Sequence, residues 1–266
     1  MADKPTDDRV FGPAWEGWET YRLFAESVKD RLRYVRHTAA EKFLDEIRAS
    51  CHAHKETMPR GFTCWRARLG CEVIERKEDA GDFAVSWPEA QPYAAQQMKP
   101  ISVWHSEGRA NPRGIPYLYL ATTRETALAE VRPWIGSTIS VGEFHTTRDF
   151  NVIDCSKHHS KEHILKLLDK CRTREEGIWI AIDQAFATPV TKDEEARDYI
   201  PTQIIAELFK HEGYDGVVYK SLLSEDGFNL ALFDIDAATM VRCDLYTATS
   251  LKFDFKSEDK GYFSGI

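Results

Sequence analysis

The order of helix-like and strand-like segments is the feature that most limits what this chain can fold into. Strand signals recur from about Gly61 to Leu245, and helical signals fall between them without a regular strand–helix–strand repeat. Because a doubly wound parallel sheet needs that repeat, the order favours an α+β domain built on a mixed sheet. The sequence also contains no G-x-G-x-x-G or P-loop motif, which argues against a Rossmann dehydrogenase and an NTPase.

The region before this domain has a helical pattern. From Trp18 to Ala53 apolar residues recur at helical spacing with charges between them, and a break near His37 predicts two helices. We therefore expect an N-terminal helical extension over residues 1–58 and the main domain over residues 59–266. An amphipathic region of this kind suits packing or oligomerisation, so a homo-oligomer is one expectation.

Within the main domain, the pattern predicts short strands and helices in mixed order. Thr122 and Glu125 fit a capping box, which marks the start of a helix that Pro133 ends. The stretch from Glu75 to Met98 holds acids, Gly and Pro without a period, and we predict a loop there. The predicted strands are 62–68, 117–121, 139–144, 151–153, 216–219, 229–233 and 240–245, and the predicted helices are 122–131, 163–170, 178–186 and 202–211.

Charge and composition narrow the classes of function. The formal net charge of −8 at pH 7 disfavours binding to a nucleic-acid backbone. No run of apolar residues approaches the length of a membrane span, and the polar N-terminus lacks the apolar core of a signal peptide. The six cysteines form no C-x-x-C pair and read as reduced thiols, with Cys64 and Cys243 in core strands. Together these features predict a cytoplasmic protein without nucleic-acid or membrane partners.

Three segments combine polar and aromatic residues in a way that packing alone does not require. The first runs from Gly108-Arg109-Ala110-Asn111 through the strand Tyr117-Leu118-Tyr119-Leu120-Ala121 to the helical Ala127-Leu128-Ala129-Glu130. The second is Trp65-Arg66-Ala67-Arg68. The third is Tyr219-x-Ser221, followed by Asn229-Leu230-Ala231-Leu232-Phe233.

Taken in their order along the chain, these three segments resemble the RES-domain family, over roughly Gly61 to Leu245. The arginine, glutamate and serine for which that family is named correspond to Arg66, Glu130 and Ser221, and Tyr119 matches its active-site tyrosine. The family's Gly-Gly-Arg-Trp-Asn turn differs here, where the chain has Glu107-Gly108-Arg109-Ala110-Asn111.

The resemblance implies a fold, an activity and partners. The implied fold is a mixed sheet of the ADP-ribosyltransferase-like type. The implied activity is that of an NAD⁺ glycohydrolase or NAD⁺ phosphorylase, an enzyme that cleaves the nicotinamide–ribose bond with water or inorganic phosphate as acceptor. NAD⁺ is then a substrate, and no cofactor is expected. Many members of the family are toxins of toxin–antitoxin pairs, so an antitoxin protein is an expected partner, and a role in defence is a related expectation.

The residue types suit this chemistry. Nicotinamide leaves NAD⁺ as a neutral molecule, so no acid has to protonate it, and a single carboxylate such as Glu130 can stabilise the cationic ribose. Arg66 has the forked donors that a pyrophosphate needs, and Arg109 is a second candidate. The substrate-binding set also contains Tyr117, Arg68 and Asn229. Tyr117 and Tyr119 share one face of their strand, so they form an aromatic wall for nicotinamide. Ser221 is expected to orient the ribose or Glu130 by a hydrogen bond.

Each residue also has a purely structural interpretation. Glu130 lies at the boundary of an apolar helix face, and Tyr119 suits a core position. Asn111 is typical of a turn, and Asn229 at the start of a strand is more often structural. His158, His159 and His163 carry no convincingly placed acid or cysteine beside them, so no metal site is expected.

Two other functions remain open at this point. An ADP-ribosyltransferase would pass the same ribose intermediate to a macromolecule. A non-catalytic module would keep the scaffold and bind a nucleotide or a partner, and the altered turn at Arg109-Ala110-Asn111 is compatible with that.

Overall fold

A computed structural model describes residues 12–79, 84–100, 107–189 and 196–252 of the chain. The polar N-terminal segment lies outside these ranges. The helices are α1 (Pro13–Asp30), α2 (Thr38–Ser50), α3 (Ala95–Met98), α4 (Arg124–Glu130), α5 (Ile164–Lys170), α6 (Arg174–Ala187) and α7 (Ile200–His211), with 3-10 turns η1 (Cys51–His54) and η2 (Ala196–Tyr199). No helix in the described ranges is long and apolar enough to cross a membrane.

A large mixed sheet forms the centre of the molecule. Its eight strands lie in the order β1-β7-β8-β9-β5-β2-β6-β10. Only β7 and β8 pair in parallel among the described neighbours, and the other neighbours are antiparallel. The α+β class and mixed sheet predicted from the order of elements are therefore confirmed. The strands are β1 (Lys55–Met58), β2 (Thr63–Leu69), β5 (Leu118–Ala121), β6 (Thr138–Thr146), β7 (Phe150–Asp154), β8 (Gly216–Lys220), β9 (Phe228–Leu232) and β10 (Ala238–Thr247).

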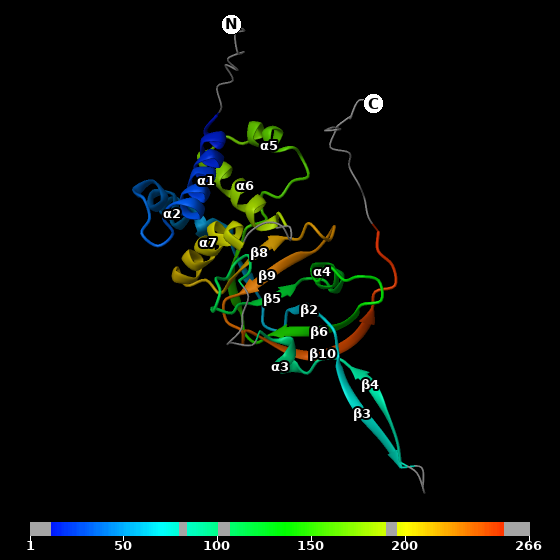
Figure 1. The fold of residues 1–266 in the computed structure, drawn as a ribbon. Helices are drawn as coiled ribbons and strands as arrows, with labels where there is room; N and C mark the ends of the chain where they lie inside the picture. Colours follow the sequence, from blue (N-terminus) through cyan, green and yellow to red (C-terminus); the bar gives the residue numbers. More distant parts are fainter. Residues whose placement is uncertain (1–11, 80–83, 101–106, 190–195, 253–266) are drawn as a thin grey trace, which may run out of the picture.

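The two faces of the sheet have different cores. One face packs against α1, α2, α6 and α7, with Phe43, Trp179 and Phe209 among its fully buried residues. Leu118, Leu120 and Leu230 point to the opposite face and form a second core. This alternation places Tyr117 and Tyr119 together on the helix-covered face. Figure 1 shows α1, α2, α6 and α7 on the side of β8 and β9, whereas α3 and α4 lie nearer β2, β6 and β10.

The N-terminal helices pack directly on the helices of the main domain. Gly17 of α1 and Gly177 of α6 make this approach possible, since a Cβ at Gly177 would lie 1.8 Å from the Ala14 carbonyl oxygen. A Cβ at Gly17 would lie 2.0 Å from the Arg174 carbonyl oxygen. Both distances are far below van der Waals contact, so a side chain at either position would push the helices apart.

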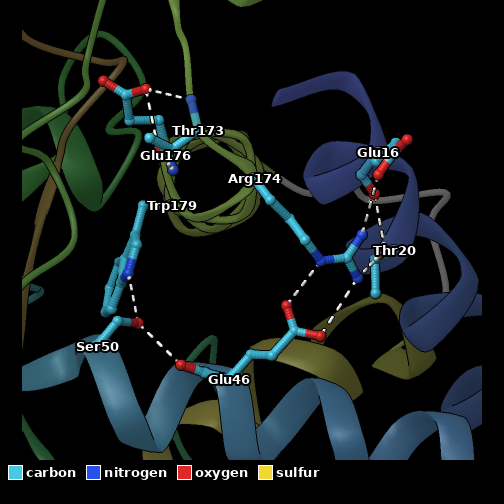
Figure 2. A network of polar contacts seen from close by, with 8 residues as sticks. All are labelled: Glu16, Thr20, Glu46, Ser50, Thr173, Arg174, Glu176 and Trp179. Carbon is cyan, nitrogen blue, oxygen red and sulfur yellow. Dashed lines mark hydrogen bonds and ion pairs between the residues drawn. The ribbon is translucent and has the colours of Figure 1, made fainter. Parts of the chain in front are cut away.

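Polar contacts fix the same helices in place (Figure 2). The Arg174 guanidinium reaches from α6 between α1 and α2, where its Nε donates to Glu46 at 2.9 Å and an Nη donates to the Thr20 hydroxyl at 2.8 Å. The buried Trp179 indole donates to the Ser50 hydroxyl at 3.0 Å. The α1–α2 pair therefore shares its core and its polar contacts with α6.

The predicted loop between Glu75 and Met98 is wrong. Strands β3 (Glu72–Asp79) and β4 (Ala84–Gln91) pair with each other as a two-stranded ribbon, and α3 follows. The ribbon projects away from the sheet (Figure 1), with Val73 and Val85 exposed. Because neither strand packs a face on the core, neither needs the alternation that would have revealed it.

Most other predicted elements are present, with shifted ends. The break near His37 is confirmed, and α2 begins at Thr38. The capping prediction is wrong by one residue, because Thr123, not Thr122, accepts the Thr126 backbone N–H at the start of α4. The short strand β1 was not predicted. All six cysteines are free, with Cys64 buried and Cys243 half-buried.

Candidate active site

A cavity of about 490 Å³ opens on the helix-covered side of the sheet. Its wall is built by β2, β5, the end of α4, β9 and the turn before β5. Six of the eight residues singled out in the sequence line it: Arg66, Arg109, Tyr117, Tyr119, Glu130 and Asn229. Ser221 and Arg68 are not among the lining residues. Ser221 is connected to the cavity by its hydrogen bond to Glu130.

Glu130 is held by two donors on one carboxylate oxygen. The Ser221 hydroxyl donates to Glu130 Oε1 at 2.7 Å, and the Asn229 amide donates to the same oxygen at 2.7 Å. Both donors are buried, while Glu130 itself is exposed to the cavity. The second oxygen, Oε2, has no hydrogen-bond partner in the described parts of the chain, so it is free to contact a ligand.

The chain places Glu130 through contacts at both ends of α4. At the N-terminal end, the Thr122 hydroxyl accepts the Phe228 backbone N–H at 3.0 Å, which ties the start of the helix to β9. Asn229 lies next along β9 and pairs with Tyr219 of β8. Ser221 directly follows β8, so the two donors and the carboxylate meet where β8 and α4 end and β9 begins.

Arg66 brings a buried guanidinium to the cavity wall without a carboxylate partner. One Nη donates to the Tyr119 backbone oxygen at 2.7 Å. Its Nε is buried and has no hydrogen-bond partner in the described structure. Burial, with the nearby Arg68 charge, lowers the pKa of Arg66 to about 10, so it remains charged at neutral pH. An unpaired buried cation is costly, and an anionic ligand would compensate it.

Tyr119 links Arg66 to the turn that carries Arg109. Its hydroxyl donates to the Asn111 side-chain oxygen at 2.7 Å and accepts the Ala110 backbone N–H at 2.9 Å. A Cβ at Gly108 would lie 2.7 Å from that hydroxyl, so the turn requires glycine there. Burial raises the pKa of Tyr119 well above its ordinary value, so the phenol stays protonated. Tyr119 therefore lines the cavity, and its hydroxyl holds the turn that carries Arg109.

Helix α7 holds the same turn from the other side. Buried Thr202 donates its hydroxyl to the Arg109 carbonyl at 2.6 Å, and buried Gln203 donates to the Gly108 carbonyl at 2.9 Å. The sequence analysis missed both residues. The available signal was two polar residues in the otherwise apolar first half of this helix, Ile200-Pro201-Thr202-Gln203-Ile204-Ile205.

Arg109 is oriented but not neutralised. One Nη donates to the Ala185 carbonyl at the end of α6, at 2.9 Å. The guanidinium lies 5.6 Å from the Tyr199 ring centroid and 5.9 Å from that of Tyr219, which is within cation–π range. Both tyrosines line the cavity. Tyr219 belongs to the third segment of the sequence, but neither tyrosine was predicted as a site residue.

The remaining expected residues take other positions. Arg68 donates to the Gln97 carbonyl and lies 4.5 Å from the Tyr93 ring centroid, outside the cavity lining. Tyr117 lines the cavity but is almost fully buried against Phe233, 4.9 Å between ring centroids. Asn111 donates to two backbone carbonyls in its turn, as its structural interpretation requires.

The histidine cluster also has a defined place. Nδ1 of His159 lies 3.3 Å from the carboxylate of the buried Asp183, and the His54 ring stacks on Trp179 with centroids 3.6 Å apart. Within the described ranges, no three His, Cys, Asp or Glu side chains are grouped to hold a metal ion.

Comparison with known proteins places this geometry in a family. No curated protein matches the chain. Among solved structures, the crystal structure of the M. tuberculosis MbcT–MbcA toxin–antitoxin complex aligns with 77% of this chain and 93% of its own, at 12% identity and a TM-score of 0.38. That likeness is too low to support an argument. The sequence profile of the RES domain matches residues 89–255. Because this match spans more than half of the 266 residues, the chain belongs to the RES domain family.

Proposed function

We propose that the protein cleaves the nicotinamide–ribose bond of NAD⁺. The observation that carries the proposal is the carboxylate of Glu130, fixed through Oε1 and free at Oε2, in a cavity that Arg66 also lines with a guanidinium that has no carboxylate partner among the described residues. A fixed negative charge beside a cationic reaction centre is the arrangement that such a reaction uses.

The bond breaks by departure of a neutral leaving group. The electron pair of the ribose C1–nitrogen bond goes to the pyridinium nitrogen, which yields neutral nicotinamide and needs no proton. The ribose becomes an oxocarbenium-like cation, and the Glu130 carboxylate stabilises it. Ser221 and Asn229 are positioning residues here, because their hydrogen bonds to Oε1 prevent the carboxylate from rotating away.

The other lining residues bind the rest of the substrate. Arg66 and Arg109 each supply a guanidinium for the pyrophosphate oxygens. Tyr119 and Tyr117 present aromatic surface against which nicotinamide can lie. On this proposal NAD⁺ is the substrate, and the reaction uses no cofactor.

The acceptor is either water or inorganic phosphate. Water adds its oxygen to C1 and loses a proton, which gives ADP-ribose. Phosphate adds an oxygen to C1, which gives the 1-phosphate of ADP-ribose. An antitoxin partner and a growth-arrest role remain proposals that follow from the family alone, and they are independent of which acceptor is used.

The test is release of nicotinamide from NAD⁺ by purified protein, with and without phosphate. Glu130→Gln keeps the size and hydrogen bonds of the side chain but removes the charge, and we expect at least a ~100-fold loss of turnover. The matched control is Glu125→Gln, on the exposed side of the same helix, which should retain activity. Circular dichroism would verify that each variant is folded.

Other outcomes identify the alternatives. Labelled ADP-ribose on a macromolecule, with no free product, would indicate an ADP-ribosyltransferase. Saturable NAD⁺ binding without nicotinamide release would indicate a binding module. Full activity of a folded Glu130→Gln protein would rule out the proposed mechanism.

A further inference from the structure

Arg132 has a backbone conformation that arginine rarely adopts. Its φ is +45°, and it is the only non-glycine residue with a positive φ among the residues that the structure describes. The left-handed region is unfavourable for an L-residue because Cβ approaches the following carbonyl. The next residue is Pro133, which restricts the preceding backbone further.

The position is one where glycine would be expected. Helix α4 ends at Glu130, Val131 caps it, and the Arg132 backbone N–H donates to the Ala129 carbonyl at 3.0 Å. Glycine most often occupies this place after a helix because it has no Cβ. Strained residues of this kind concentrate at functional sites. The side chain, not the backbone, must therefore explain why arginine stands here.

The side chain of Arg132 is available to a ligand. Arg132 is exposed and lines the same cavity as Glu130, which lies two residues before it in the chain. In the described parts of the chain its guanidinium forms no hydrogen bond and no ion pair. Arg66 and Arg109 lie on other elements of the same wall and likewise lack a carboxylate partner there. A third unpaired guanidinium adds positive charge next to the carboxylate that faces the ribose.

We propose that Arg132 is a phosphate-binding residue of this cavity, held beside the reacting ribose by the strained end of α4. The proposal rests on the proposed function, because it names a further contact of the same substrates. Phosphate oxygens suit a guanidinium by charge and by its forked donors. Two sources of such oxygens are close to the ribose in this reaction, the pyrophosphate of NAD⁺ and inorganic phosphate as acceptor.

The test combines two variants with steady-state kinetics. Arg132→Gly removes both the cation and the strain, and Arg132→Lys keeps the charge but loses the fork. Arg113→Ala is the control, because it removes an exposed arginine that does not line the cavity. The KM for NAD⁺ is measured without phosphate, and the KM for phosphate is measured at saturating NAD⁺. Thermal unfolding is measured on the same samples.

We expect Arg132→Gly to raise one of the two KM values about tenfold, with a smaller rise for Arg132→Lys. A rise in the KM for NAD⁺ without phosphate assigns Arg132 to the pyrophosphate, and a rise confined to phosphate assigns it to the acceptor. The same Arg132→Gly protein should be more stable, with a midpoint raised by about 2 °C, because the strain is gone.

The proposal is overturned if wild-type protein releases nicotinamide and Arg132→Gly leaves both KM values at the wild-type level. A wild-type protein that binds and cleaves no NAD⁺ would instead remove the proposed function itself.

Discussion

Two arginines show how this molecule separates binding from folding. Arg174 of α6 lies against α1 and α2 and donates hydrogen bonds to Glu46 and Thr20, and the hydrogen bond with Glu46 raises its pKa. Arg66 lies in the cavity wall, has one hydrogen bond to a backbone oxygen, and leaves a buried Nε without a partner. The fold supplies partners for the first guanidinium, whereas the described structure leaves part of the second without one.

The same contrast applies to other buried polar atoms. Besides Arg66 Nε, the described structure leaves Asp183 Oδ1 and Arg36 Nε buried without a hydrogen-bond partner. Neither Asp183 nor Arg36 lines the cavity. An unsatisfied atom in the cavity should therefore affect substrate binding, and one outside it should affect stability alone.

Replacing Arg66 should have the largest effect. Arg66→Ala removes a charged donor from the pyrophosphate, so the KM for NAD⁺ should rise about 10- to 100-fold. The free energy of unfolding should change little. The variant loses one hydrogen bond, but it also loses the cost of burying an incompletely paired charge. Arg68→Ala, two residues along the same strand, is the control and should leave KM unchanged. An equal rise in the KM for NAD⁺ from both substitutions would show that binding depends on the net charge of β2 and not on the position of Arg66.

Asp183 should affect stability in a pH-dependent way. Burial, with the nearby Asp154 carboxylate, raises the pKa of Asp183 to about 7, whereas an aspartate in an unfolded chain titrates near ~3.9. Between these values the folded protein keeps a proton that the unfolded chain has released. The free energy of unfolding contributed by this group therefore falls as pH rises from about 4 to 7, and stays low above that.

Asp183→Asn cannot ionise, so it removes this loss. At pH 8 the variant should exceed wild type in free energy of unfolding by on the order of 2 kcal/mol, and near pH 4 the two should converge. Urea titrations at both pH values measure the difference, and nicotinamide release should be unaffected. A variant that is less stable than wild type at pH 8 would mean that the charged carboxylate is compensated, for example by His159, 3.3 Å away.

Replacing Arg174 should give the smallest effect. Its side chain is more than one-third exposed, so solvent screens its ion pairs. Arg174→Ala should lower the free energy of unfolding by about 1 kcal/mol, with KM and turnover unchanged. Arg22→Ala is a control, since the ion pairs of Arg22 with described residues, Glu19 and Glu26, lie within α1. A change in the KM for NAD⁺ upon Arg174→Ala would show that the packing of α1 and α2 on α6 influences substrate binding in the cavity.

The sequence predicted elements wherever burial imposes a period. Strand β5 alternates Leu118 and Leu120 with Tyr119 between the two cores, and helix α4 buries one face, so the spacing of their apolar residues could be recognised. The β3–β4 ribbon was missed because its strands pair only with each other and pack no face on the core. Strand β1 was missed because only Met58 of its four residues is buried, so it shows no apolar alternation.

The site was only partly predictable for a different reason. The order of motifs indicated Glu130 and Ser221, but the hydrogen bond between them spans 91 positions in the sequence and depends on the tertiary fold. Thr202 and Gln203 were missed because their carbonyl partners, on the Gly108–Arg109 turn, lie more than ninety residues away. Arg132 was missed because a positive φ at a non-glycine residue leaves no mark in the sequence.

The central claim is that the unsatisfied groups of the cavity are completed by NAD⁺. The most direct measurement is a crystal structure of the Glu130→Gln protein soaked with NAD⁺, in which slow turnover preserves the substrate. The account predicts that the nicotinamide ribose lies against residue 130 and that a pyrophosphate oxygen accepts a hydrogen bond from the Arg66 guanidinium. A dinucleotide bound elsewhere, with the cavity beside Arg66 empty, would contradict it.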